Sequence, residues 1–371
     1  MEAKKENLPM RALYLLEIIF VVDGHIPLPD LFDMGGLMGY YSFHLMLFAF
    51  ASGYFFRLYG NPGQDLLHRA KRLLAPLYLW NLVYGALAFL LRRFGGFTLG
   101  EPLSLYTLLL APVTDGEHFV WNLGAWYLFP LFAVQVCYAA LRRVSRCWKD
   151  EEGLTFLLCL LPGIAAVLRL QASQNEPLWL LRTLVLLPGY AAGVLYRRRL
   201  EEKDTLPALP LMAGILLARG ILLLRFGNLS YLLSSGTYFL CGPAGVYLGG
   251  GLAIWFWVRV SRLLGEQMER SRLALYASRH TLSIMLHHYM GFFAMNAVFL
   301  LLNWKGLGAA DFSVRSFRTQ TGYVYAPGGG PGWTALYLAA GLLLPLALAR
   351  IGERIRTCAG NKIKRINKTE P

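Results

Sequence analysis

The chain has 371 residues and a net charge of +14, and 56% of its residues are hydrophobic while only 16% are charged. A soluble globular protein typically carries about a quarter charged residues, so the composition excludes an ordinary soluble enzyme. The charges gather in short clusters between long apolar runs. This pattern predicts an all-α, polytopic bundle of membrane helices.

The apolar runs predict about ten membrane spans in chain order. A span needs ~20 apolar residues because each residue of a helix rises 1.5 Å and the hydrocarbon core is about 30 Å thick. The predicted spans are 12–27, 41–58, 73–91, 121–141, 154–170, 178–196, 206–224, 234–258, 274–302 and 333–350. The apolar segment 102–112 is too short to cross, so we expect it to be interfacial or re-entrant. We expect residues 1–371 to form one integral membrane domain that ends in a basic tail, 351–371.

Basic residues set the expected orientation. With the N-terminus inside, 27 of the 36 Lys and Arg fall on the cytoplasmic side, as the positive-inside rule requires. Among them are Lys4, Lys5, Arg146 and Lys149. We therefore expect a cell-membrane protein with both termini in the cytoplasm. Basic loops that meet anionic lipid explain the net charge without a nucleic-acid partner.

The cysteines and two long loops limit the kinds of site that the chain is expected to hold. The five cysteines are Cys137, Cys147, Cys159, Cys241 and Cys358, an odd number with no metal-ligand spacing. We expect no disulfide framework, no zinc or other metal site and no catalytic thiol. Two long outer segments, 92–120 with Glu117 and His118, and 303–332, are candidates for functional loops.

Ionisable residues inside spans are the candidate functional groups, because burying them in lipid costs free energy. Arg11 and His25 are fourteen residues apart, which places them within ~40° of one helix face and ~21 Å apart along the axis. His44 and His287 fall at a similar depth in the outer half. A single histidine near a span end is usually just an interfacial residue, but three at one depth favour a shared cavity. His288 points about 100° away from His287, so we expect it to matter less.

Several segments resemble one family of membrane enzymes. They are Arg11 to His25, Ser42 to Tyr54, Arg69 to Pro76, Trp126-Tyr127-Leu128, and Thr281 to His287, the last being similar to a Ser-x-Tyr-Leu-x-His pattern. Together they resemble the acyltransferase 3 family, especially its fucose 4-O-acetylase-like branch. The chain departs from the family at Leu47, where a proline is usual, at Met285, where a tyrosine is usual, and in the longer spacing from Arg11 to His25.

The resemblance implies an O-acyltransferase that moves an acyl group, usually acetyl, from cytoplasmic acyl-CoA to a hydroxyl of a surface carbohydrate. A neutral histidine can accept the hydroxyl proton during attack on the thioester, and basic side chains pair with the phosphates of CoA. We assign His25, His44 and His287 to catalysis, with His25 as the base. We assign Arg69, Lys71 and Arg72 to the acyl-CoA donor, and Arg11, Ser52, Trp126 and Ser283 to substrate.

Two other functions remain open from the sequence. A transporter or flippase for a lipid-linked glycan or polysaccharide could use the same polar cavity without chemistry. A non-catalytic membrane partner would explain the packing but leaves the intramembrane histidines without a role. The sequence does not name the acceptor or the oligomeric state.

Overall fold

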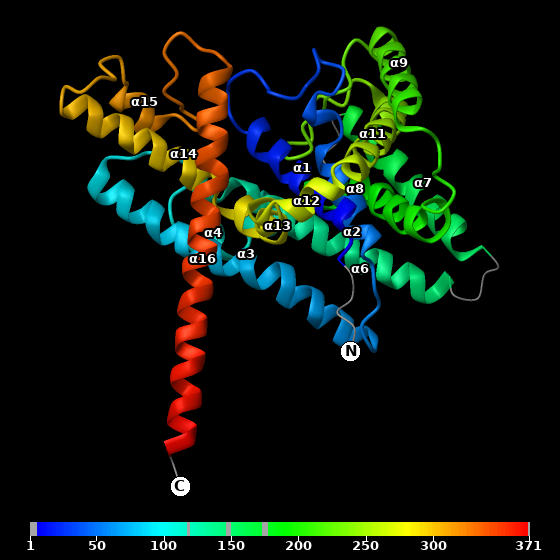
Figure 1. The fold of residues 1–371 in the computed structure, drawn as a ribbon, viewed down its shortest axis with the longest axis horizontal. Helices are drawn as coiled ribbons and strands as arrows, with labels where there is room; N and C mark the ends of the chain where they lie inside the picture. Colours follow the sequence, from blue (N-terminus) through cyan, green and yellow to red (C-terminus); the bar gives the residue numbers. More distant parts are fainter. Residues whose placement is uncertain (1–5, 117–118, 146–149, 173–176, 370–371) are drawn as a thin grey trace.

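The computed structural model describes residues 6–116, 119–145, 150–172 and 177–369, with the side chains of the last helix described as far as Cys358. The residues outside these ranges include seven named above: Lys4, Lys5, Glu117, His118, Arg146, Cys147 and Lys149. The described chain is a bundle of helices (Figure 1), as the composition predicts. Its extended pairing is limited to an isolated bridge between Leu232 and Thr237.

The helical elements are joined by connections of very different length, and the longest are 25–39 and 227–241. In chain order they are α1 (Leu8–Gly24), η1 (Tyr40–Ser42), α2 (His44–Tyr54), α3 (Pro62–Gly95), α4 (Leu105–Leu109), α5 (Ala111–Thr114), η2 (Val120–Tyr127), α6 (Leu128–Val144), α7 (Glu151–Gln171), α8 (Leu178–Leu195), η4 (Tyr196–Leu200), α9 (Ala208–Phe226), α10 (Gly242–Ala244), η5 (Gly245–Gly249), α11 (Gly250–Leu263), α12 (Gly265–Arg270), α13 (Arg272–Arg279), α14 (Thr281–Trp304), α15 (Val314–Thr319) and α16 (Pro331–Thr369).

Each of the ten predicted spans coincides with a helix, but seven helices in the described chain are long and apolar enough to cross a membrane. They are α3, η2 with α6, α7, α8 with η4, α9, α14 and α16. The other three predicted spans coincide with α1, α2 and the α10–α11 stretch. The 17 residues of α1 and the 11 residues of α2 fall short of the length that identified the other spans, so the predicted count of ten spans is not confirmed.

Some predicted boundaries are wrong. The predicted span 274–302 is broken at His280, which lies between α13 and α14. The predicted span 234–258 becomes helical only at Gly242, a residue with a positive φ that precedes Pro243. The segment 102–112 forms α4 and the start of α5, which lie against α3 where Asn81 donates hydrogen bonds to the carbonyls of Thr107 and Leu108.

Helix α1 is the centre of the bundle. It contacts α2, α11, α12, α13, α14 and α16, which explains why even its polar residues are buried. Helices away from this centre also pack closely, and glycine allows α2 to approach α8. A Cβ atom at Gly53 would overlap the backbone carbonyl of Tyr190, and one at Gly193 would overlap that of Phe50. Small residues permit such close approach between membrane helices.

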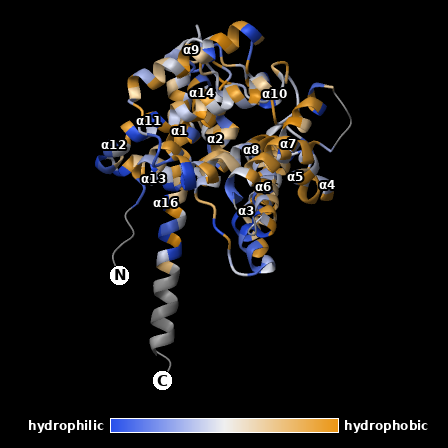
Figure 2. Ribbon diagram, turned by 90° about the vertical axis from the view of Figure 1, so that its right-hand side faces the viewer, coloured by the Kyte–Doolittle hydropathy of each residue, from blue (hydrophilic) through white to orange (hydrophobic). Residues whose placement is uncertain are grey.

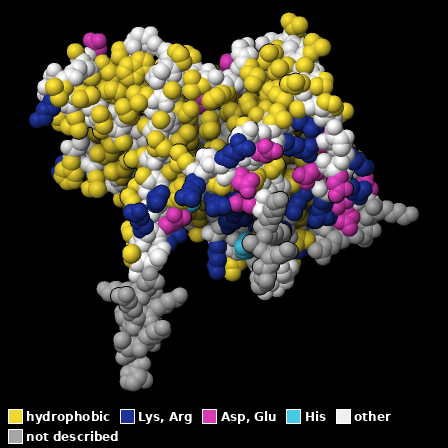
Figure 3. Space-filling model, in the orientation of Figure 1, with side chains coloured by type: hydrophobic (Ala, Val, Ile, Leu, Met, Phe, Trp, Pro, Cys, Tyr) yellow, Lys and Arg dark blue, Asp and Glu magenta, His cyan; other side chains and the backbone are white. Residues whose placement is uncertain are grey.

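The outer helices expose apolar side chains. Leu79 and Leu82 on α3, Leu161 on α7, and Leu209 and Leu224 on α9 are each more than half exposed. Figure 3 shows hydrophobic side chains over most of the upper part of this face, with charged side chains gathered in a band below them. In Figure 2 the apolar colouring likewise follows the helices that carry these side chains. A surface of this kind suits lipid rather than water.

The beginning of α1 and the far part of α16 lie at the same end of the bundle. Glu6, just before α1, pairs with Arg279 at the end of α13 at 2.5 Å. From the same region, Tyr276 and His280 both contact Glu353 of α16, at 3.0 Å each. We call this charged end, which carries Glu6, Arg279 and Glu353, the inner face. We call the opposite end of the bundle the outer face.

Candidate functional site

The outer end of α1 carries His25. The helix ends at Gly24, and the sequence Ile26-Pro27-Leu28-Pro29 prevents it from continuing, since proline lacks the backbone donor that a helix needs. His25 occupies the C-cap position. The negative end of the helix dipole therefore lies beside its ring.

Asp23 and Tyr40 bring His44 to the same place. The Tyr40 hydroxyl donates to the Asp23 carboxylate at 2.5 Å, and the Leu31 backbone N–H donates to the same oxygen at 2.9 Å. The Tyr40 carbonyl in turn accepts a hydrogen bond from Nδ1 of His44 at 2.6 Å. A carbonyl only accepts, so Nδ1 of His44 carries the proton and Nε2 has the free lone pair.

His25 and His44 line one cavity of about 200 Å³. Its walls come from α1, η1, α2, η2, α14 and the loop before α10. The lining includes Val21, Tyr41, Leu45, Phe48, Gly124, Trp126, Tyr127, Ser234, Met285 and Tyr289. The lining is mostly apolar and carries five aromatic side chains besides the two imidazoles, which is typical of a pocket that positions a ligand against few polar groups.

His288, which we expected to matter less than His287, lies against His25. The two rings are stacked with their centroids 5.0 Å apart, and His288 is completely buried. Its Nδ1 donates to the carbonyls of Ile284 and Met285, at 3.1 and 2.9 Å. Its Nε2 therefore has the lone pair, and this atom has no hydrogen-bond partner among the described residues.

The prediction that His287 shares this cavity is wrong. Its Nδ1 contacts the Tyr84 hydroxyl at 2.7 Å, and its ring lies against Trp80 of α3 with the centroids 4.2 Å apart. Ser283 also faces away from the cavity and donates to the Pro345 carbonyl of α16 at 3.2 Å. The face of α14 that meets the cavity carries Met285 and Tyr289 instead.

Trp126 does line the cavity, and a buried arginine holds it there. The guanidinium of Arg182 lies 5.0 Å from the centre of the Trp126 ring. The same group donates to the carbonyl of Asp115 at 3.0 Å and to that of Leu233, another lining residue, at 3.3 Å. Arg182 therefore fixes two walls of the cavity at once.

The three basic residues assigned to the donor do not act alike. Arg69 is buried and pairs with Asp65 at 2.9 Å. Its other contacts are the Arg57 carbonyl at 2.9 Å and the side chain of Gln135 at 3.2 Å. Lys71 and Arg72 are exposed at the inner face. The predicted cluster is therefore divided into one buried structural arginine and two exposed cations.

Arg69 and Ser52 are joined by a residue that the sequence did not single out. Gln135 of α6 accepts from Arg69 and donates to the Ser52 hydroxyl at 3.1 Å. Ser52 lies one turn inward of Phe48 on α2, and it does not line the cavity. Arg11 is also at the inner face, where it pairs with Glu6 at 2.6 Å. Of the four residues assigned to substrate, Trp126 alone lines the cavity.

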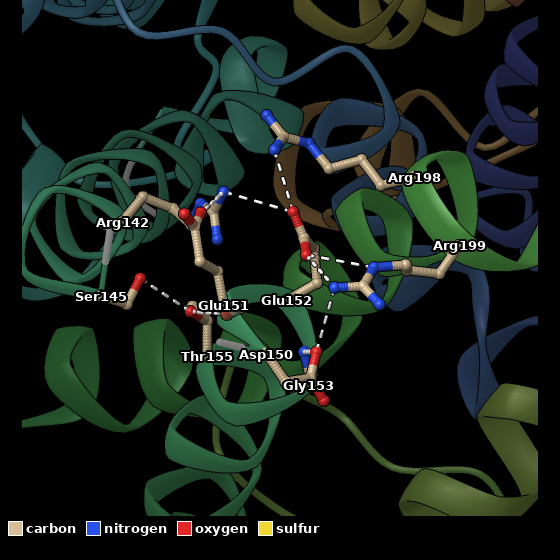
Figure 4. A network of polar contacts seen from close by, with 9 residues as sticks. All are labelled: Arg142, Ser145, Asp150, Glu151, Glu152, Gly153, Thr155, Arg198 and Arg199. Atoms are coloured by element: carbon tan, nitrogen blue, oxygen red, sulfur yellow. Dashed lines mark hydrogen bonds and ion pairs between the residues drawn. The ribbon is translucent and has the colours of Figure 1, made fainter. Parts of the chain in front are cut away.

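Most of the remaining charge at the inner face is internally paired. Figure 4 shows Glu152 at the centre of one network, with Arg198 at 3.0 Å and Arg199 at 2.8 Å. Arg142 pairs with Glu151 at 2.6 Å in the same network. The network ties the start of α7 to α6 and η4. In the described residues, no group of His, Cys, Asp and Glu is arranged to hold a metal ion.

The sequence carries a signal for His288. When the Ser-x-Tyr-Leu-x-His pattern is laid on Ser283, its histidine falls on His288 and its tyrosine on Met285. No local pattern identifies Tyr41, Gln135 or Arg182, because their roles depend on contacts between distant helices.

Comparison with known proteins identifies the family. A sequence profile described as an acyltransferase domain matches residues 15–350, a range that includes both histidines of the cavity and reaches into every predicted span. No curated protein and no solved structure matches the chain. The match covers far more than half of the chain, so the protein belongs to the acyltransferase 3 family of membrane acyltransferases.

Proposed function

We propose that the protein transfers an acyl group, most simply acetyl, from cytoplasmic acyl-CoA to a hydroxyl of a cell-surface carbohydrate. The observation that carries this proposal is the outer cavity, where two imidazoles stand among aromatic side chains that suit a sugar ring. Family membership favours this function over a transporter. The Lys and Arg residues that gather at the inner face support an orientation with both ends of the chain in the cytoplasm of the cell membrane.

His25 is the proposed base. It takes the proton of the acceptor hydroxyl while the oxygen attacks the thioester carbon. The new C–O bond forms, the C–S bond breaks, and the proton passes from His25 to the leaving CoA sulfur, so protons and charge balance. His44 presents the lone pair of Nε2 to the same cavity and orients the acceptor through a second hydroxyl.

Lys71 and Arg72 are the proposed donor-binding cations, because they are exposed where CoA arrives. CoA carries a pyrophosphate and a 3′-phosphate, which such side chains bind well. Arg69 positions the start of α3 and has no role in direct contact with the donor.

Two assays test the function. Membranes that contain the protein and its acceptor should release free thiol from acetyl-CoA, and membranes without the protein should not. Mass spectrometry of surface glycans from cells that lack the protein should show the loss of one acyl mass per modified unit. Unchanged glycans together with no thiol release would contradict the proposal.

A further inference from the structure

Glu17 is a buried acid that the proposed reaction does not use. It lies in the middle of α1 and its side chain is fully buried. Neither carboxyl oxygen has a hydrogen-bond partner among the described residues. An unpaired charge in such a place would cost many kcal/mol, so the group is a neutral carboxylic acid that can both donate and accept. Leaving both capacities unused also costs free energy.

The position of Glu17 relates it to the cavity. Glu17, Val21 and His25 are spaced by four residues, so they follow one stripe of α1. Val21 and His25 line the cavity, and Glu17 is one turn further inward. Its carboxyl group lies near Tyr127, another lining residue, and near Tyr14. Glu17 therefore lies directly behind the inner wall of the cavity.

Further polar contacts lie between this position and the inner face. Tyr14, one turn inward of Glu17, donates to the Ala51 carbonyl of α2 at 3.2 Å. The next residue, Ser52, accepts from Gln135, which accepts from Arg69. Polar side chains from α1, α2 and α6 thus follow the direction in which a donor from the cytoplasm must reach the histidines.

The distances fit the chemistry of a CoA thioester. Glu17 and His25 are eight residues apart, which is ~12 Å along the helix axis. The arm that links the thioester to the nucleotide carries two amides, about 5 and 10 Å from the thioester carbon when extended, by ordinary bond lengths. An amide that enters an apolar passage needs a hydrogen-bond partner there.

We propose that Glu17 binds the amide-bearing arm of the acyl-CoA donor, through a hydrogen bond between its carboxyl group and one of the two amides. This inference rests on the proposed function. It assigns the donor three separate contacts: cations for the phosphates at the inner face, Glu17 for the arm, and the histidine cavity for the acyl group.

Two ligands test the contact with the arm independently of the contacts with the phosphates. S-Acetonyl-CoA has the whole arm but cannot transfer an acyl group, and 3′,5′-ADP has phosphates without the arm. Glu17→Leu should weaken S-acetonyl-CoA binding about tenfold, the value expected for one lost hydrogen bond, and leave 3′,5′-ADP binding unchanged. Glu17→Gln, which can still donate and accept, should remain within about threefold of the wild type for both ligands.

Thermal stability in detergent supplies the second readout. Removing an unsatisfied buried group should leave the melting temperature of Glu17→Leu equal to or above that of the wild type. A matched control is Asn296→Leu, since Asn296 is also buried in a span but bonds Tyr323, Tyr325 and Tyr337. That variant should melt earlier and keep its affinity for S-acetonyl-CoA.

The outcomes distinguish the two proposals. If Glu17→Leu binds S-acetonyl-CoA like the wild type, or loses both ligands equally, the arm contact is wrong while the acyltransferase function stands. If the wild type binds neither ligand and releases no thiol from acetyl-CoA, the proposed function itself is wrong.

Discussion

The outer cavity and the inner face use polar residues in opposite ways. At the inner face, charges are numerous and mostly satisfied by one another, as Glu152 with its arginines and Asp65 with Arg69 and Arg143 show. Around the cavity, polar groups are few, and Nε2 of His288 and the carboxyl of Glu17 have no partner among the described residues. Paired groups hold a structure together, whereas unpaired buried groups cost stability and are retained at sites of function.

The largest expected effect is on catalysis by His25. Replacing His25 with Ala removes the base, so acyl transfer should fall at least 10²-fold, while S-acetonyl-CoA should bind as in the wild type. The measurement is thiol release from acetyl-CoA together with a binding titration. His280→Ala is the control, because His280 contacts Glu353 at the inner face, far from the cavity. Full activity in His25→Ala would remove the proposed base.

Arg69 and Arg72 test the division between structural and donor-binding charge. Arg69→Ala leaves the buried Asp65 with Arg143 as its remaining cation, so we expect a loss of about 3 kcal/mol in stability and a poor yield of folded protein. Arg72→Ala should melt like the wild type but bind 3′,5′-ADP roughly five- to tenfold more weakly, with a reduced dependence on salt. Thermal melts and titrations at two salt concentrations measure both. The same phenotype in the two variants would contradict the division.

His288 and His287 are neighbours with different expected roles. His288→Asn should lower kcat about tenfold, leave donor KM near the wild-type value and move the acid limb of the kcat profile, because His25 loses the ring that packs against it. His287→Asn should change kcat less than threefold and lower stability by about 1 kcal/mol, since Tyr84 loses its hydrogen bond. Steady-state kinetics between pH 5 and 9 and thermal melts compare the two. A larger kcat effect at His287 would reverse the assignment.

The smallest expected effect is a pH dependence of stability at the outer loop. Burial, aided by Asp23 and Asp33, raises the pKa of Asp30 to about 6. A carboxyl with a raised pKa in the folded state binds its proton more tightly there than when unfolded, so stability decreases as pH rises from about 4 to 6 and is level above. Asp30→Asn should remove this slope and melt slightly later at pH 8. Identical melting curves for both proteins across this range would contradict it.

Much of the site could be predicted because local patterns identify it. The sequence shows the hydrophobic runs, with His25 at the end of the first run and His44 at the start of the second. The structure places both histidines in one cavity. The prediction failed where the rotation of a helix decides the outcome. His287 and His288 differ by about 100° around α14, and packing against α3 and α1 determines which of them meets His25.

By itself the sequence determined the class of the protein, because hydropathy and charge clustering act locally and require no partner. It also determined which residue types could perform acyl transfer. Only the tertiary structure decided which of them cooperate. Arg69 pairs inward with Asp65 while Lys71 and Arg72 remain exposed. The carboxyl of Glu17 is buried because α1 is surrounded by other helices, and it has no hydrogen-bond partner within the described ranges. Such contacts join residues far apart in the chain, so their outcome depends on how the helices pack and not on any local pattern.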